Sequence, residues 1–419
     1  MAAASKQRCK TKDMRHALLL ENPHSTADQI FAQHDIEVVR HKGAMDEDEL
    51  AEALQGFEIV GIRSKTNVTE KVLKANPQLA AIGAFCIGTN QIDLKQASKQ
   101  GVAVFNAPYS NTRSVVELAI SEIIALTRRL TVRNSLLHRG IWDKSAVGSH
   151  EVRGRTLGII GYGNIGTQLS VLAEAIGMKV VFYDTAERLA LGNAQPMPTM
   201  DDVLRVADVV SLHVDGAPQN TSMFGKREFE LMKPGSLFIN LSRGFVTDID
   251  ALVEALESKH LAGAAVDVFP KEPKASGDPF TSPLVGMDNV ILTPHVGGST
   301  EEAQYDIGRF VSNKLVDYVR SASTDMSVNL PNLILPPSQA SRYRVALIHR
   351  NTPGVLALVN QTFAEHGANI TGQILGTTGG IGYAITDISS ELPIEAISHI
   401  DDMEDTIRMR VLRCPTDKA

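Results

Sequence analysis

The sequence predicts an α/β protein built from two doubly wound parallel sheets and a smaller C-terminal βαββαβ unit. Strand-like and helix-like segments alternate along most of the 419 residues, and such alternation is typical of parallel sheets with helices on both faces. A glycine-rich turn follows an apolar segment near the middle of the chain, as in many doubly wound folds. A proline-rich stretch at residues 330–340 precedes a fresh strand–helix pattern, which indicates a linker and a further domain.

The first α/β series occupies the first quarter of the chain. Its predicted elements are a strand at 17–21, a helix at 25–34, a strand at 36–39, a helix at 47–54 and a strand at 58–62. Ser25 is the predicted N-cap of the first helix, because a serine side chain can accept a hydrogen bond from a free helix amide. The alternation continues to about Phe105, so we expect one parallel sheet in this region.

The second series begins with a long helix predicted at 114–130. Six strands follow, separated by helical stretches, at 156–160, 179–183, 209–213, 236–240, 263–268 and 289–292. Six such strands fit a doubly wound sheet. The amphipathic stretch at 301–319 predicts one long helix. That helix could cross back to the first domain, which would make the first domain discontinuous.

The C-terminal unit begins at Arg342. Its predicted strands and helices follow the order strand, helix, strand, strand, helix, strand, at 344–349, 355–366, 369–375, 381–388, 394–403 and 406–412. This order is that of a ferredoxin-like βαββαβ unit. Because the unit is short, we expect it to dock or to pair in order to bury one face of its sheet.

Composition excludes several classes of protein. A net charge of −7 argues against nucleic acid or an anionic membrane as the partner. The three cysteines, Cys9, Cys86 and Cys414, are far apart, so their spacing predicts no metal site and suits reduced thiols in the cytoplasm. No apolar run approaches the roughly 18 residues that a membrane span requires.

The strongest local motif is a GxGxxG turn between a predicted strand and a helix. Gly161 permits the tight turn, Gly163 allows the backbone to approach a pyrophosphate, and Gly166 lets helix and strand pack closely. Asn164 and Ile165 open the helix, whose free amides favour phosphate. Asp184 ends the next predicted strand, near the offset expected for the residue that binds the adenosine ribose hydroxyls. A carboxylate there would repel a 2′-phosphate, which favours NAD over NADP.

Three later segments place polar residues at the carboxyl ends of predicted strands, where doubly wound folds bind ligands. Arg243 suits a carboxylate through its planar, bidentate guanidinium. His295 suits a base that takes a hydroxyl proton, and Glu272 suits a carboxylate that orients this histidine. Each residue alone also fits a structural role, as a surface ion pair, a loop charge or a partly buried histidine. Together, and in this order after the glycine turn, the three residues favour an enzyme that oxidises a 2-hydroxy acid.

At these motifs the chain resembles the D-2-hydroxyacid dehydrogenase family. The resemblance implies NAD as cofactor and a contact between Asp267 and the nicotinamide carboxamide. It also implies a flavodoxin-like, discontinuous substrate domain at 1–107 and 299–335, and a dinucleotide-binding domain at 108–298. The segments 63–66, 83–93 and 105–111 resemble the branch that oxidises D-3-phosphoglycerate to 3-phosphohydroxypyruvate, the first step of the phosphorylated route to L-serine.

In that branch the substrate would be bordered by Arg63, Asn106 and Ser110. The resemblance also offers candidates for the substrate phosphate, from the same or a neighbouring subunit, namely Lys42, Lys65 and Lys144. Two positions depart from the pattern. Lys65 stands where close relatives carry Arg, so bidentate geometry would be lost. Asp215 stands where the family usually has Pro beside the adenine.

The C-terminal unit, at 342–419, resembles an ACT domain through the segments 349–356 and 367–370. The resemblance implies an allosteric L-serine site between two subunits, with His349, Asn351 and Asn369 as ligands. It also implies a homotetramer. A dimerisation module that binds no effector is the alternative for this unit.

Two alternatives to this function stay open. One is a dehydrogenase of the same family that acts on another 2-hydroxy acid, such as lactate or glyoxylate. The other is a regulatory protein that senses NAD(H) without turnover, although simple binding would not require Arg243, Glu272 and His295 together.

Overall fold

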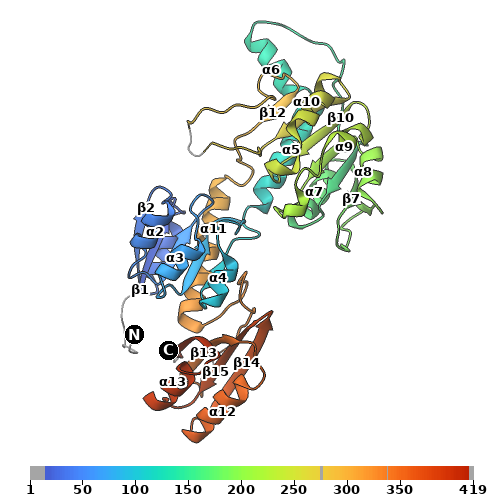
Figure 1. The fold of residues 1–419 in the computed structure, drawn as a ribbon. Coiled ribbons are helices and arrows are strands. Elements are labelled where there is room, and N and C mark those ends of the chain that lie inside the picture. Colours follow the sequence, from blue (N-terminus) through green and yellow to red (C-terminus); the bar gives the residue numbers. More distant parts are fainter. Residues whose placement is uncertain (1–14, 274–276, 337, 415–419) are drawn as a thin grey trace. The chain divides into compact units, whose positions relative to one another are not determined.

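The computed structural model describes residues 15–273, 277–336 and 338–414, so Cys9 lies outside the described residues. The chain forms two compact units. One joins the residues before Tyr109 to those after Ala303, and the other is Tyr109–Ala303. Figure 1 traces the chain through both units in sequence colours. The structure confirms the predicted α/β class, with two parallel sheets and a C-terminal antiparallel sheet.

The first unit contains a five-stranded parallel sheet in the order β2-β1-β3-β4-β5. Its strands are β1 (Arg15–Leu20), β2 (Ile36–His41), β3 (Ile59–Ile62), β4 (Ala81–Ala84) and β5 (Ala103–Phe105). The helices between them are α1 (Thr26–Ala32), α2 (Glu47–Ala53), α3 (Glu70–Ala75) and α4 (Leu94–Lys99). Leu18 and Leu19 are both buried, in different core clusters. The sheet is therefore covered on both faces, as parallel sheets usually are.

The predicted Ser25 cap of α1 is wrong. Ser25 already has helical backbone angles, φ −64° and ψ −13°, and its side chain makes no capping hydrogen bond. The ring Nδ1 of His24 accepts a hydrogen bond from the Thr26 amide instead, at 3.2 Å. A residue whose side chain caps a helix normally has non-helical backbone angles, which bring the side chain to the free amides. Ser25 has helical angles.

The second unit contains a seven-stranded parallel sheet in the order β12-β11-β10-β9-β6-β7-β8. Its strands are β6 (Thr156–Ile160), β7 (Lys179–Tyr183), β8 (Gln195–Pro196), β9 (Val209–Leu212), β10 (Ser236–Asn240), β11 (Leu261–Val266) and β12 (Val290–Leu292). Its helices are α5 (Thr112–Thr127), α6 (Leu130–His138), α7 (Asn164–Ala175), α8 (Met200–Val206), α9 (Lys226–Leu231) and α10 (Ile249–Glu257). All six predicted strands are present, and the two-residue β8 was not predicted.

The helix predicted at 114–130 ends early, at Thr127. Arg129 adopts a left-handed backbone with φ 53°, and the chain then starts the separate helix α6. A left-handed residue cannot continue a right-handed helix, so the single predicted helix becomes two.

Helix α11 (Glu301–Ser321) follows the second sheet and leads to the C-terminal unit. That unit contains β13 (Tyr343–Arg350), α12 (Val355–Glu365), β14 (Ile370–Thr378), β15 (Ile381–Ile388), α13 (Ile394–Asp401) and β16 (Thr406–Arg413), with strand order β14-β15-β13-β16. Helices α12 and α13 lie on one face of this antiparallel sheet (Figure 1). Across the described ranges, no helix is both long and apolar enough to cross a bilayer.

The other face of the antiparallel sheet docks within its own chain. Ala346, Ile348 and Ile385 belong to the same apolar cluster as Tyr318 of α11 and Leu333 of the predicted linker. Intrachain docking therefore buries the second face that a short βαββαβ unit would otherwise expose. The linker has no helix or strand among its described residues, but its leucines anchor it to the core.

A buried ion pair fixes this docking. Arg344 and Asp387 are 4% and 1% exposed, and two parallel hydrogen bonds of 2.6 and 2.8 Å join them. The Arg344 guanidinium also donates to the carbonyl of Ser321, at the end of α11. The pair thus links two strands of the C-terminal sheet to the helix beneath it.

We expect Asp387→Asn to lower the free energy of unfolding by about 3 kcal/mol, because the Arg344 charge would stay buried without its counter-ion. Urea denaturation followed by circular dichroism measures this. Glu365→Gln on the exposed end of α12 is the matched control and should change stability by less than about 0.5 kcal/mol. Equal effects of the two substitutions would contradict the role of the buried pair.

Candidate functional site

The polar residues predicted for the site follow neighbouring strands of the second sheet. The glycine turn follows β6, Asp215 lies after β9, Arg243 follows β10 and Asp267 follows β11. These strands are parallel and adjacent. Their carboxyl ends therefore meet at one edge of the sheet, where doubly wound folds bind ligands.

The glycine turn has the geometry that its sequence predicts. Gly161 has φ 93°, and a Cβ there would lie 2.5 Å from the carbonyl oxygen of His213. A Cβ on Gly166 would lie 2.3 Å from the Gly161 carbonyl oxygen, whereas a Cβ on Gly163 would meet open space. Asn164 and Ile165 form the first residues of α7, whose N-terminus no side chain caps. The turn therefore leaves room for a phosphate against free helix amides.

Asp184 is tied to this turn. Its side chain is 11% exposed, Oδ2 accepts a hydrogen bond from the Tyr162 amide at 2.8 Å, and Oδ1 accepts one from the Ala186 amide at 2.9 Å. Arg188 lies 3.4 Å from the same carboxylate. The carboxylate is thus held at the end of β7, the position expected of a residue that binds ribose hydroxyls.

Asp215, the departure from the family pattern, shapes its turn by hydrogen bonding. Its Oδ1 accepts hydrogen bonds from the Ala217 amide at 3.1 Å and from Nδ2 of Asn220 at 2.8 Å. Side-chain bonds of this kind stabilise turns. They take the place of the fixed φ that a proline would impose.

His295 and Glu272 form a direct pair. Nδ1 of His295 lies 2.9 and 3.1 Å from the two Glu272 oxygens. The hydrogen bond with Glu272, and the carboxylate charge, raise the pKa of His295 above its usual value despite partial burial. Burial alone would raise the pKa of Glu272, but the hydrogen bonds from His295 and from the Phe269 amide outweigh it and lower that pKa. The pair therefore favours a charged imidazole beside a carboxylate.

Arg243 lies close enough to this pair to influence the pKa of both partners through its charge. Its Nη1 donates to the Ser242 carbonyl at 2.7 Å. Asn240 fixes the backbone at this point, because Nδ2 donates to the Arg243 carbonyl at 3.1 Å and Oδ1 accepts from the Ser242 amide at 3.0 Å. A guanidinium therefore lies near the imidazole and carboxylate pair.

Asp267 organises the loop that carries His295. The side chain is 1% exposed and accepts three hydrogen bonds, from Oγ1 of Thr293 at 2.6 Å and from the amides of Val296 and Gly297 at 2.8 Å each. The Asp267 carbonyl also accepts from the His295 amide. The family resemblance implied only a cofactor contact for Asp267, and its hydrogen bonds within the loop are known only from the three-dimensional structure.

Glu122, on α5, is a titratable residue that sequence reasoning missed. It is 3% exposed, and neither of its carboxyl oxygens has a hydrogen-bond partner within the described part of the chain. Burial, and the nearby charge of Asp267, raise its pKa to about 8. It occupies an apolar face of an amphipathic helix, so the sequence could have flagged it only as a misplaced charge.

In the first unit, the predicted substrate residues lie at the carboxyl edge of the first sheet. Lys42 follows β2, Arg63 and Lys65 lie after β3, and Asn106 follows β5. Nδ2 of Asn106 donates to the carbonyl of Ile87 at 2.6 Å. These four residues therefore share one edge, while Ser110 and the exposed Lys144 belong to the second unit.

The predicted effector residues fall at two ends of the C-terminal sheet. His349 is 3% exposed and pairs with Gly382 at one end of β15. The side chain of Asn351 donates to the Gly379 carbonyl at the same end. Asn369 precedes Ile370, which pairs with Ile388 at the opposite end of β15. One chain therefore does not bring the three ligands together.

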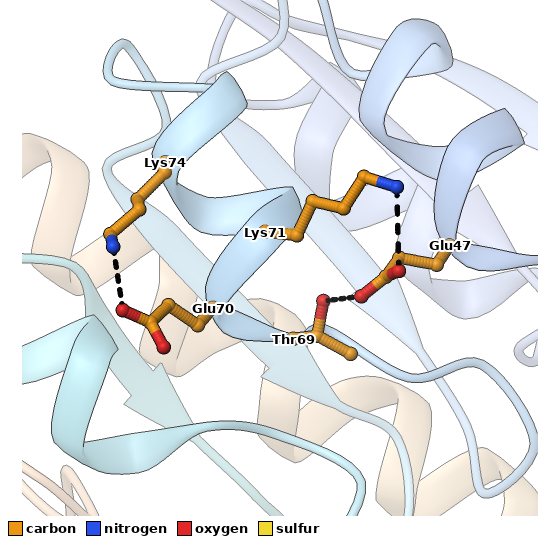
Figure 2. Close-up of a pocket in the computed structure, with 5 residues that line it drawn as sticks. All are labelled: Glu47, Thr69, Glu70, Lys71 and Lys74. Atoms are coloured by element: carbon orange, nitrogen blue, oxygen red, sulfur yellow. Dashed lines mark hydrogen bonds and ion pairs between the residues drawn. The ribbon is translucent and has the colours of Figure 1, made fainter.

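A surface hollow elsewhere in the first unit is lined by Glu47, Thr69, Glu70, Lys71 and Lys74. Figure 2 shows that its side chains pair with one another: Lys71 with Glu47, and Lys74 with Glu70 at 2.7 Å. None of the predicted site residues lines it. The hollow is best explained by exposed ion pairs, of which Lys71–Glu47 joins α2 to α3 and Lys74–Glu70 lies within α3.

Comparison with known proteins agrees with this geometry. Residues 120–297 match the family described as D-isomer specific 2-hydroxyacid dehydrogenase, NAD binding domain. Residues 345–408 match the AHAS small subunit-like ACT domain.

Among curated proteins, the chain is 50% identical to a D-3-phosphoglycerate dehydrogenase of Escherichia coli over 96% of this chain and 98% of that protein. It is 48% identical to D-3-phosphoglycerate dehydrogenase 2 of Saccharomyces cerevisiae, over 91% and 83% respectively. A solved D-lactate dehydrogenase from Aquifex aeolicus, complexed with NAD and lactic acid, superposes with a TM-score of 0.65 at 26% identity over 77% of this chain and all of that chain.

We expect Glu122→Gln to stabilise the protein increasingly as the pH rises. The folded carboxyl keeps its proton up to about pH 8, whereas an ordinary glutamate loses its proton near 4.5. Between these values the wild type should lose about 1.4 kcal/mol of stability per pH unit through this residue, and glutamine should not. Melting temperatures across this pH range measure the difference. Parallel profiles for the two proteins would show that Glu122 is not protonated in the folded state.

Proposed function

Because this chain belongs to the D-isomer-specific 2-hydroxyacid dehydrogenase family, we propose that it oxidises D-3-phosphoglycerate to 3-phosphohydroxypyruvate. It is an NAD-dependent dehydrogenase, as the match to the family's NAD-binding domain shows. The identity to D-3-phosphoglycerate dehydrogenases covers nearly the whole chain, which supports this substrate over lactate or glyoxylate. The observation that carries the chemistry is the direct contact between His295 and Glu272 beside Arg243.

The residues of the glycine turn fit a dinucleotide. Open space at Gly163, the uncapped start of α7 and the anchored Asp184 would hold its pyrophosphate and ribose. Asp267 would meet the nicotinamide carboxamide. Bound NAD supplies the acceptor for the hydride that leaves C2 of the substrate.

In this proposal the three catalytic side chains have distinct roles. Arg243 binds the substrate carboxylate and polarises the C2 oxygen. Neutral His295 takes the hydroxyl proton at Nε2 as the hydride leaves, because Nδ1 is engaged with Glu272. Glu272 orients the imidazole and stabilises its charged form after proton transfer.

The substrate also carries a phosphate, for which the first unit offers cations. Arg63, Lys42 and Lys65 share the sheet edge that carries Asn106, and charged groups of this kind favour a ligand with both carboxylate and phosphate. Ser110 and Lys144 complete the proposed set from the second unit. Lys144 would act on the substrate of a neighbouring subunit.

We propose L-serine as the effector and a homotetramer as the assembly. Nδ1 of His349 donates to the Arg350 carbonyl at 2.7 Å, and its Nε2 is buried with no hydrogen-bond partner among the residues that the structure describes. A second copy of the C-terminal unit could bring its Asn369 to this end of the sheet. Around α6, Trp142 is 79% exposed, with Leu130, Leu137, Ile141 and Val147 also exposed, which supports a further contact between copies. We place the enzyme in the cytoplasm.

The direct test is NADH formation from 3-phosphoglycerate, with and without L-serine. We expect turnover that serine reduces, and a much lower kcat/KM with D-lactate. A higher kcat/KM with D-lactate would contradict the proposed substrate. Full activity at saturating serine would contradict the proposed effector while leaving the dehydrogenase intact.

We expect Glu272→Gln to shift the acid limb of kcat/KM for oxidation to lower pH. His295 must be neutral to accept the proton, and Glu272 raises its pKa above 6.5. Removing the carboxylate charge should return the midpoint toward that value and lower the plateau at least about tenfold. A pH profile of initial rates measures both effects. An unchanged midpoint would show that another group controls the acid limb.

A further inference from the structure

Glu21 lies at the topological switch point of the first sheet. It follows β1 directly, where the strand order reverses between β1 and β3. Open α/β sheets bind ligands beside such a switch point. Glu21 and Asn22 both adopt left-handed backbones, with φ 62° and 54°. Non-glycine residues keep this conformation only where the surrounding contacts require it, often at functional sites.

The Glu21 carboxylate binds the loop after β3 through three backbone amides. Its Oε1 accepts from the amides of Arg63 at 3.2 Å and Thr66 at 2.8 Å, and Oε2 accepts from the Lys65 amide at 3.0 Å. Nearby amides that converge on one anion form a concave nest. Hydrogen bonds to a charged acceptor are stronger than neutral ones, so the path of the 63–66 backbone depends on this carboxylate.

Gln91 holds the same backbone from its other side. It is 7% exposed, and its Nε2 donates to the carbonyl of Arg63 at 2.7 Å and to the carbonyl of Gly88 at 3.2 Å. Both polar backbone groups of Arg63 are therefore engaged. The hydrogen bonds with Glu21 and Gln91 therefore fix the backbone from which the Arg63 side chain extends.

The geometry points to Glu21 as a positioning residue for the substrate. Its carboxylate sets the 63–66 loop and thereby places the Arg63 guanidinium and the Lys65 ammonium. This inference rests on the proposed function, in which these cations bind the substrate anion. Glu21 is itself an anion and would repel the substrate, so its presence beside the cations is explained by the three amides that it binds.

The test is Glu21→Gln, which keeps the size of the side chain but replaces one acceptor oxygen by an NH2 donor. We expect the KM for 3-phosphoglycerate to rise about tenfold, since small displacements of a positioning group are costly. The Kd for NADH should stay within about twofold of wild type, because the cofactor residues belong to the second unit. Amide hydrogen exchange in the 63–66 loop should become faster.

Two further variants separate positioning from loss of stability. Gln91→Met removes the donor to the Arg63 carbonyl and should raise the same KM. Asp208→Asn weakens another carboxylate that accepts a backbone amide, that of Thr156 at 2.8 Å, at the amino end of the second sheet. It should lower the melting temperature and leave the KM unchanged.

An unchanged KM in Glu21→Gln, or an equal rise in the Kd for NADH, would overturn the inference. If the wild type oxidises another D-2-hydroxy acid and not 3-phosphoglycerate, the substrate proposal fails, and the same KM comparison on that acid decides the role of Glu21. If the wild type oxidises none, the exchange measurement decides it, and unaltered loop exchange counts against Glu21.

Discussion

The buried carboxylate of Asp267 makes the hydrogen bonds on which the candidate site at the edge of the second sheet depends. It accepts hydrogen bonds from Thr293, Val296 and Gly297 and so closes the loop that carries His295. His295 has φ 55° within this loop, a conformation that non-glycine residues rarely adopt. Asp267 thus binds the Thr293 hydroxyl before the imidazole and two backbone amides after it, and His295 faces Glu272 between these contacts.

Other carboxylates of the molecule act in the same way. Asp184 joins the end of β7 to the glycine turn through the Tyr162 amide, and Glu21 gathers three amides of the loop after β3. In each case an internal anion orders backbone amides at the carboxyl edge of a parallel sheet. A carboxylate of the chain itself can bind several converging backbone amides, which would otherwise lack hydrogen-bond partners within the protein.

The C-terminal unit uses a different means of attachment. An apolar sheet face packs on α11, and the buried pair of Arg344 and Asp387 fixes the register of that packing. The pair links the unit to the last turn of α11, at Ser321.

Much of the fold could be predicted from the sequence because local residue patterns determine which segments form strands, helices and turns. The alternation of strand-like and helix-like segments predicted the parallel sheets. The glycine spacing predicted a turn at Gly161, whose positive φ only glycine adopts easily. The positions of Arg243, Asp267 and His295 followed as well, because the carboxyl ends of adjacent parallel strands must meet at one edge. Local patterns mispredicted α1, where the His24 ring and not Ser25 accepts a helix amide, and α5, which ends before the left-handed residue Arg129.

The tertiary structure alone decided which distant groups meet. The sequence does not reveal that Glu122 is buried with no hydrogen-bond partner in the described part of the chain, or that Glu21 binds the loop of Arg63. Nor does it reveal that Asn369 lies at the opposite end of β15 from His349. Such contacts depend on strand order and register, which bring together residues that are far apart in the chain. A local pattern specifies that a strand forms and which face it buries, but its neighbours are selected by the packing of the whole domain.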